Sequence, residues 1–156
     1  MYNFGNFVQW QNHDKTLVIG ILGPDPFGDH IKLIENQEVK GKKIVIHRFP
    51  SAEKYDKPCH ILFIAPTQPK EKSSAEQRLA QILPRIQKES VLLVGDTDGL
   101  AEKGAVINFY LEEDKAAKRF NNKLEVNRSA EKRARLTIDA RLLKIMRHVD
   151  DAPEGK

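Results

Sequence analysis

Two loops carry the residue types that most often bind ligands in an α/β protein. One reads Gly-Pro-Asp-Pro-Phe-Gly at 23–28, after an apolar run at 17–22, and the other reads Gly-Asp-Thr-Asp-Gly at 95–99, after an apolar run at 91–94. Ligands of an open parallel sheet bind at the carboxyl ends of its strands. We therefore expect any small-molecule site on the rim that these loops form; the alternative is that both loops are only turns. The candidate rim residues are Gly23, Asp25, Phe27, Gly28, Asp96, Thr97 and Gly99.

Neither loop fits a nucleotide or calcium motif. The loop at 23–28 is not Gly-x-Gly-x-x-Gly or a P-loop, and its two prolines lack the backbone N–H groups that hold phosphate. The loop at 95–99 lacks the later ligands of an EF-hand, including its glutamate. Turn chemistry explains both, because aspartate bonds local amides and glycine takes positive φ.

Histidine and cysteine give no catalytic or metal-binding pattern. The five histidines are scattered, and none has a partner at a metal-ligand spacing. Cys59 and His60 are neighbours in an extended segment, so their side chains point to opposite faces and pair poorly for catalysis. A single cysteine also excludes an intramolecular disulfide, and Cys59 is expected to be a small buried side chain. We expect no metal, no cofactor and no enzymatic activity.

Aromatic residues gather at the start of the chain. A helix over 2–10 would place Phe4, Phe7 and Trp10 on one side. Such a stripe packs into the core or forms a partner-binding face. We take these three residues as candidate partner contacts, together with the predicted edge strand.

Length and charge exclude other classes of protein. A chain of 156 residues is enough for one sizeable core, and the net charge of +4 is modest. Acidic residues interrupt the basic cluster at 128–147, which favours a solvated helix face over a nucleic-acid surface. No apolar run approaches the roughly 20 residues that span a bilayer, so we expect no membrane insertion.

The order of apolar runs and helical patterns predicts an α/β fold. Strands are expected at 17–22, 44–49, 61–65, 91–94, 105–111 and 118–126, and helices at 2–10, after Gly28, from a capping box at Ser73, at 128–134 and after Asp139. Strands that alternate with helices indicate three layers: a largely parallel sheet of about six strands with an antiparallel edge, and helices on both faces. Residues 1–149 would form one domain, and 150–156 a disordered tail.

Several short motifs occur in the order and spacing of a known family. They are Tyr2-Asn3-Phe4 to Phe7-Val8-x-Trp10, Ile21-Leu22-Gly23-x-Asp25-Pro26-Phe27-Gly28, Val39-x-Gly41-Lys42, Cys59-His60-Ile61-Leu62-Phe63-Ile64, Val91-Leu92-Leu93-Val94-x-Asp96 with Gly99, Gly104-x-Val106-Ile107-x-Phe109, Asn127-x-x-x-Ala130 and Leu136-x-Ile138-x-x-x-Leu142-Leu143. With these motifs the chain, from about residue 2 to 149, resembles the YfiR family.

The resemblance implies a non-enzymatic regulator. YfiR-like proteins are usually periplasmic, follow a cleaved signal peptide that is absent from this chain, and bind the periplasmic part of a membrane diguanylate cyclase, so that they control cyclic di-GMP. Other members work with a histidine kinase, and the alternative is therefore a small-ligand sensor module for such a kinase. A homodimer is the expected assembly. With Cys59 as its one cysteine, this chain departs from members in which disulfides provide redox control.

Overall fold

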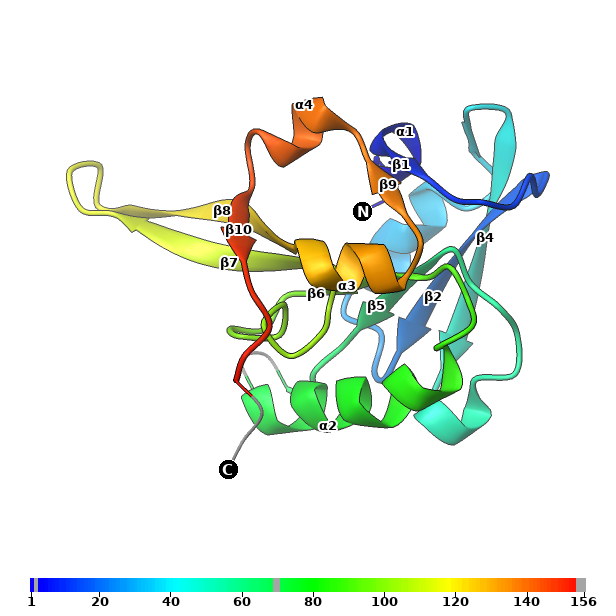
Figure 1. The fold of residues 1–156 in the computed structure, drawn as a ribbon, viewed down its shortest axis with the longest axis horizontal. Coiled ribbons are helices and arrows are strands. Elements are labelled where there is room, and N and C mark those ends of the chain that lie inside the picture. Colours follow the sequence, from blue (N-terminus) through cyan, green and yellow to red (C-terminus); the bar gives the residue numbers. More distant parts are fainter. Residues whose placement is uncertain (2, 69–70, 154–156) are drawn as a thin grey trace.

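A mixed, largely parallel sheet forms the centre of the molecule (Figure 1). The computed structural model describes residues 1, 3–68 and 71–153. Within these residues eight strands pair in the order β10-β8-β7-β6-β5-β2-β4-β3. The strands are β2 Thr16–Leu22, β3 Glu38–Val39, β4 Lys42–Phe49, β5 Ile61–Ile64, β6 Leu92–Gly95, β7 Ile107–Asp114, β8 Arg119–Asn127 and β10 Arg147–Val149.

Parallel pairing runs through the middle of the sheet. Strand β2 lies between β4 and β5, with Ile19 opposite both Ile46 and Ile61. Every residue of β5 and β6 is buried, as expected for strands that are covered on both faces. Antiparallel pairing occurs in the β7–β8 hairpin and between β3 and β4.

Helices cover both faces of the sheet. One face packs on α2 Lys72–Ile82 and on the 3-10 turns η2 Ala52–Lys54 and η3 Leu83–Arg85. The other packs on α1 Phe4–Phe7, η1 Gly28–Leu33, α3 Arg128–Arg133 and α4 Ala140–Leu143, and on a small sheet of β1 Val8–Gln9 and β9 Thr137–Ile138. Figure 1 shows α2 on the side of the sheet opposite α3 and α4. The predicted three-layer α/β fold is confirmed.

The sheet has two more strands than predicted, and its antiparallel edge is formed by β3 rather than by the strand predicted at 118–126. Strand β8 pairs antiparallel with β7, but β10 then pairs with β8 in parallel and closes that side. The helix predicted after Asp139 is short, Ala140–Leu143, and strand β10 follows it at Arg147–Val149. A strand of three residues is too short to show a periodic pattern, so the sequence did not reveal it.

The opening helix and the helix after Gly28 are also shorter than predicted. Only Phe4–Phe7 is α-helical, because Val8 turns extended and pairs with Ile138. A Cβ on Gly5 would lie 2.7 Å from Val39, so this helix packs closer than a larger residue allows. The segment Gly28–Leu33 forms a 3-10 helix.

Helix α2 begins without the predicted capping box. Its N-cap is Glu71, and Ser73 forms no side-chain cap bond. Ser74 connects the start of the helix to the preceding loop. Its hydroxyl accepts from the Thr67 N–H at 2.9 Å and donates to the Glu71 carbonyl at 3.3 Å. The helix ends at Ile82, two residues before Pro84, whose ring and missing N–H do not allow the helix to continue.

Part of the predicted tail is bonded to the body of the molecule. The Asp151 carboxylate accepts from Arg133 at 2.8 Å and from the Asn127 side chain at 2.7 Å. The Ala152 N–H donates to the Glu102 carbonyl at 2.7 Å. Residues 154–156 of the predicted tail lie outside the described residues.

Candidate functional site

The aromatic residues at the start of the chain lie in the N-terminal segment, residues 3–15. This segment docks through β1, in which Val8 pairs with Ile138 of β9. The Asp139 N–H then donates to the Phe7 carbonyl at 2.7 Å. In the docked segment, the three predicted partner contacts differ in how much of each side chain is exposed.

Phe4 is a core residue rather than a surface contact. Only 5% of Phe4 is exposed, and its ring packs against Phe109 with centroids 6.0 Å apart. Burial of the ring stabilises the fold but leaves no surface for a partner, so Phe4 is removed from the contact candidates.

Phe7 and Trp10 are half-buried and keep part of their surface exposed. The Arg141 guanidinium lies over the Phe7 ring, 5.6 Å from its centroid. The Trp10 indole N–H donates to the His60 carbonyl at 2.9 Å. Both side chains are thus held in place, and both remain predicted contacts.

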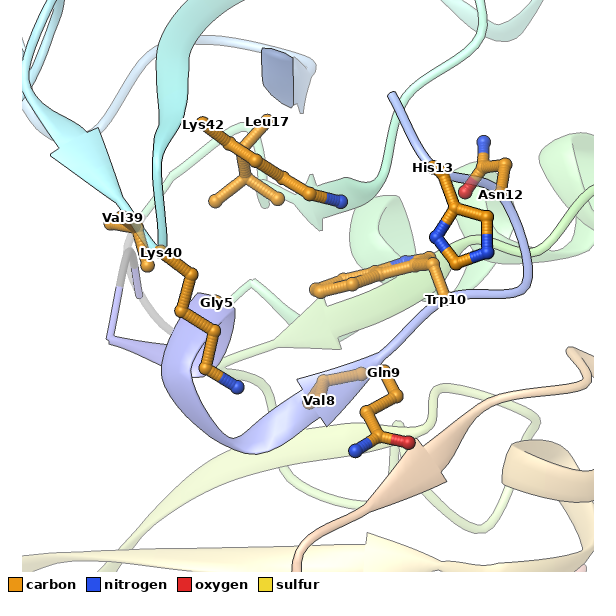
Figure 2. Close-up of a pocket in the computed structure, with 10 residues that line it drawn as sticks. All are labelled: Gly5, Val8, Gln9, Trp10, Asn12, His13, Leu17, Val39, Lys40 and Lys42. Carbon is orange, nitrogen blue, oxygen red and sulfur yellow. The ribbon is translucent and has the colours of Figure 1, made fainter. Parts of the chain in front are cut away.

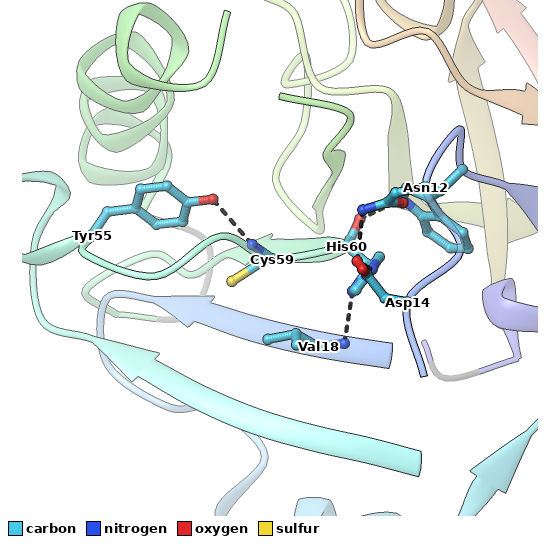
Figure 3. A network of polar contacts seen from close by, with 7 residues as sticks. Asn12, Asp14, Val18, Tyr55, Cys59 and His60 are labelled. Carbon is cyan, nitrogen blue, oxygen red and sulfur yellow. Dashed lines mark hydrogen bonds and ion pairs between the residues drawn. The ribbon is translucent and has the colours of Figure 1, made fainter. Parts of the chain in front are cut away.

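A buried histidine anchors the same segment to the sheet, and no sequence motif indicated this role. His60 is 5% exposed; its Nδ1 accepts from the Val18 N–H at 2.9 Å, and its Nε2 lies 2.8 Å from Asp14 Oδ2 (Figure 3). An acceptor Nδ1 requires the proton on Nε2, which then donates to Asp14. Burial lowers the pKa of His60, although the Asp14 carboxylate works in the opposite direction. The neutral ring therefore belongs to the folded state.

Cys59 lies beside this network but does not act with it. Its side chain is buried against Gly20, where a Cβ would lie 2.7 Å from the sulfur. The Cys59 N–H donates to the Tyr55 hydroxyl at 3.2 Å (Figure 3). Burial, with the Glu89 carboxylate nearby, raises the pKa of the thiol to about 12. A thiol of this kind packs as an apolar group and is a poor nucleophile.

The first half of the predicted rim has its polar groups satisfied locally. Asp25 Oδ1 accepts from the Phe27 N–H at 2.7 Å and the Gly28 N–H at 3.3 Å, and Oδ2 accepts from Arg48 at 2.9 Å. Partial burial opposes ionisation of Asp25, but the bonds from Arg48 and Phe27 hold its pKa below the usual value. Phe27 packs edge-on against Phe63 at 4.9 Å. This loop has the geometry of a turn.

A side chain from α2 occupies the rim beside Gly23. A Cβ on Gly23, whose φ is +101°, would lie 2.8 Å from Arg78. The Arg78 guanidinium donates to the Ala65 carbonyl at 2.7 Å and to the Thr67 hydroxyl at 2.9 Å. Arg78 thus covers the carboxyl ends of β2 and β5.

The second half of the rim borders a separate cavity of about 550 Å³. Asp96 and Thr97 line it with residues of the β7–β8 hairpin and Lys72, whereas residues 23–28 do not. Gly99 lies nearby, since its Cβ position is 3.4 Å from the Lys72 ammonium. Burial raises the pKa of Asp96. The two loops of the predicted rim therefore do not share this cavity.

A network of polar side chains, partly buried, is bonded to Thr97, one of the residues that line this cavity. The Asn108 side-chain amide donates to the Thr97 carbonyl at 3.0 Å and to Glu125 at 2.8 Å. Arg147 donates to the other oxygen of Glu125 and lies 3.9 Å over the Tyr110 ring. The Asn108 Oδ1 is buried and has no hydrogen-bond partner among the described residues.

The β7–β8 hairpin extends well beyond the rest of the sheet (Figure 1). Strand β6 pairs with β7 only at Ile107 and Asn108, and β10 pairs with β8 only from Glu125 onward. Leu111 is 53% exposed and Phe120 66% exposed on this outer part. Leu111 lies opposite Asn122, two residues from Phe120, so the two apolar side chains share a face.

The described residues contain no helix that is long and apolar enough to cross a membrane. In the same part of the chain, no group of three or more histidine, cysteine, aspartate or glutamate side chains is placed to hold a metal ion.

The fold defines the class as an α/β domain with a doubly covered sheet, and comparison with known proteins gives its family. The model of the YfiR/HmsC-like family matches residues 1–147, so the chain belongs to that family. No curated protein matches the chain.

Solved structures with a similar fold are distant in sequence. An ABC domain in complex with L-Trp from Streptococcus pneumoniae has a TM-score of 0.57 at 13% identity, over 85% of this chain and 55% of that one. A conserved domain protein from Vibrio cholerae O1 biovar El Tor has a TM-score of 0.51 at 12% identity, over 84% of this chain and 54% of that one. This chain thus spans just over half of each, and the likeness is one of fold.

Proposed function

We propose that this protein is a non-enzymatic periplasmic regulator that binds the periplasmic part of a membrane diguanylate cyclase and thereby controls cyclic di-GMP. Membership of the YfiR/HmsC-like family supports this role. Its docking surface would combine the outer β7–β8 hairpin with the exposed parts of Phe7 and Trp10.

The exposed apolar face of the hairpin is the observation that carries the proposal. Leu111 and Phe120 continue a face whose inner residues, Phe109 and Leu124, pack against the core. Isolated exposed apolar residues are common, but two large ones on one face of a protruding hairpin mark a candidate interaction site. Aromatic anchors such as Phe120 often dominate the binding energy of an interface.

Binding to the cyclase tests the proposal. We expect the double variant L111E/F120E to bind the periplasmic part of the cyclase about tenfold or more weakly, because two anchors are lost and charges are placed in the interface. L33E is the matched control, because Leu33 is 68% exposed in η1 and lies outside the hairpin. Biolayer interferometry with the purified partner gives the affinities.

Cellular cyclic di-GMP provides the functional readout. Expression of the wild type and of L33E should lower it, and expression of L111E/F120E should not. A folded L111E/F120E variant with wild-type affinity would rule out the hairpin as the docking surface. The same affinity and cyclic di-GMP measurements on F7E and W10E decide whether the N-terminal segment contributes to partner binding.

A second candidate function is a small-ligand sensor that works with a histidine kinase. The cavity of about 550 Å³ that Asp96 and Thr97 line favours this alternative. Bound ligand raises the melting temperature by mass action. A periplasmic metabolite that shifts the wild type but not D96A would support the sensor, and no shift with any compound would favour partner binding alone.

A further inference from the structure

A hollow of about 220 Å³ lies between the N-terminal segment and the β3–β4 hairpin, on a different part of the surface from the predicted rim. Trp10, Leu17 and Val39 supply apolar surface to it. His13, Lys40 and Lys42 supply basic side chains, and no aspartate or glutamate lines it. Figure 2 shows the Lys42 side chain extending across the hollow toward Trp10 and His13. The hollow therefore combines apolar walls with basic side chains and has no acidic side chain in its lining.

The backbone holds the two lysines at the hollow. Lys40 and Gly41 both have positive φ, 50° and 76°, and form the tight turn between β3 and β4. Val39 pairs directly with Lys42, so these two side chains lie on the same face of the hairpin. No described carboxylate lies within ion-pairing distance of Lys40 or Lys42. Both ammonium groups are thus available to an anion.

Trp10 forms a fixed wall rather than a mobile one. Its indole N–H donates to the His60 carbonyl at 2.9 Å, and its ring meets the His60 ring edge-on with centroids 5.8 Å apart. A wall that is ordered before binding lowers the entropic cost of binding.

We propose that this hollow binds a small amphipathic monocarboxylate, with the carboxylate beside Lys40 and Lys42 and the apolar body against Trp10, Leu17 and Val39. The volume suits a ligand of a few carbon atoms rather than a nucleotide or a large cofactor. No residue of the β7–β8 hairpin lines the site, so its test does not depend on docking through that hairpin, although Trp10 belongs to both proposals.

Trp10 also provides the measurement, because it is the only tryptophan of the chain. Hexanoate is the probe, since it absorbs no light at the excitation wavelength of tryptophan. Titration of the full chain should change the Trp10 fluorescence in a saturable way in the millimolar range. Neutral hexanamide and, at matched ionic strength, inorganic phosphate should bind about fivefold or more weakly, because each lacks one half of the recognised chemistry.

Charge removal at two positions tests the lysines. The variant K40Q/K42Q should bind hexanoate about fivefold or more weakly than the wild type, while K43Q should bind it like the wild type. Lys43 is the matched control, because it is exposed on the same strand but on the opposite face. A linear fluorescence response, equal binding of phosphate, or equal affinity of K40Q/K42Q and K43Q would each overturn the proposal; unchanged melting temperatures confirm that the variants are folded.

Discussion

At the scale of single residues, His60 determines how the N-terminal segment is held. Its ring accepts from the Val18 N–H and donates to Asp14, while its carbonyl accepts from Trp10. A protonated ring carries a hydrogen on both nitrogens, and the Val18 bond then becomes a clash of two donors. The contacts of His60 therefore require the neutral ring.

The pH dependence of stability follows from the lowered pKa of His60. The folded pKa lies below the unfolded value of 6.5, so the unfolded state takes up the proton first as the pH falls. Stability should decrease as the pH drops through 6.5 toward the folded pKa. The variant H60Q should be less stable at pH 8 and should show a smaller decrease between pH 7 and pH 5. Urea unfolding across this range provides the measurement; equal slopes for H60Q and the wild type would exclude His60 as the source.

At the scale of elements, Asn127 joins three parts of the chain at the end of β8. It is fully buried, caps α3 by accepting from the Ala130 N–H at 2.9 Å, and donates to the Ala101 carbonyl at 2.8 Å. Its amide also donates to Asp151, which holds residues of the predicted tail.

The variant N127A should lose about 2–3 kcal/mol of stability, because the cap of α3 is lost and the Ala101 carbonyl and the Asp151 carboxylate each lose a hydrogen bond. The same substitution at Asn122, exposed on the same strand, should cost less than about 0.5 kcal/mol. Chemical denaturation gives both values. If N127A and N122A were equally stable, the hydrogen bonds of Asn127 would contribute nothing to the free energy of unfolding.

The elements also show what the sequence could and could not predict. Continuous apolar runs located β2, β5 and β6, because strands buried on both faces need apolar residues at most positions. Strand β4 was located by the shorter run Ile44-Val45-Ile46, although its buried and more exposed residues alternate. The two-residue β3 and three-residue β10 are defined by their neighbours and carry no pattern of their own.

The candidate sites were predictable to the same limited degree. Asp25 and Asp96 do follow strands β2 and β6, but β5 lies between these strands and Arg78 covers its end. The His60–Asp14 pair joins residues 46 positions apart, a contact that exists only once β2 and β5 are neighbours. Phe120 was placed in a strand correctly, but its exposure depends on how far the hairpin extends past β6 and β10.

At the scale of the whole molecule, stability is distributed unevenly between the sheet centre and the hairpin. Strands β2, β5 and β6 lie between two apolar layers, one under α2 and one under α1, α3 and α4. The outer β7–β8 hairpin has strand neighbours on neither side, and an isolated hairpin is marginally stable in water. The proposed docking surface therefore lies on the part of the sheet that is held least firmly.

Amide hydrogen exchange should reveal this gradient. Amides of β5 and β6 should exchange only through global unfolding, while those of residues 110–123 should exchange orders of magnitude faster through local opening. The cyclase partner, if it docks on this hairpin, should slow exchange at residues 110–123 and leave β5 unchanged, because only the local opening is suppressed. Protection of the free hairpin equal to that of β5 would contradict this distribution of stability. Partner-induced protection confined to η1 and the β3–β4 turn would show that the docking surface does not include Leu111 and Phe120.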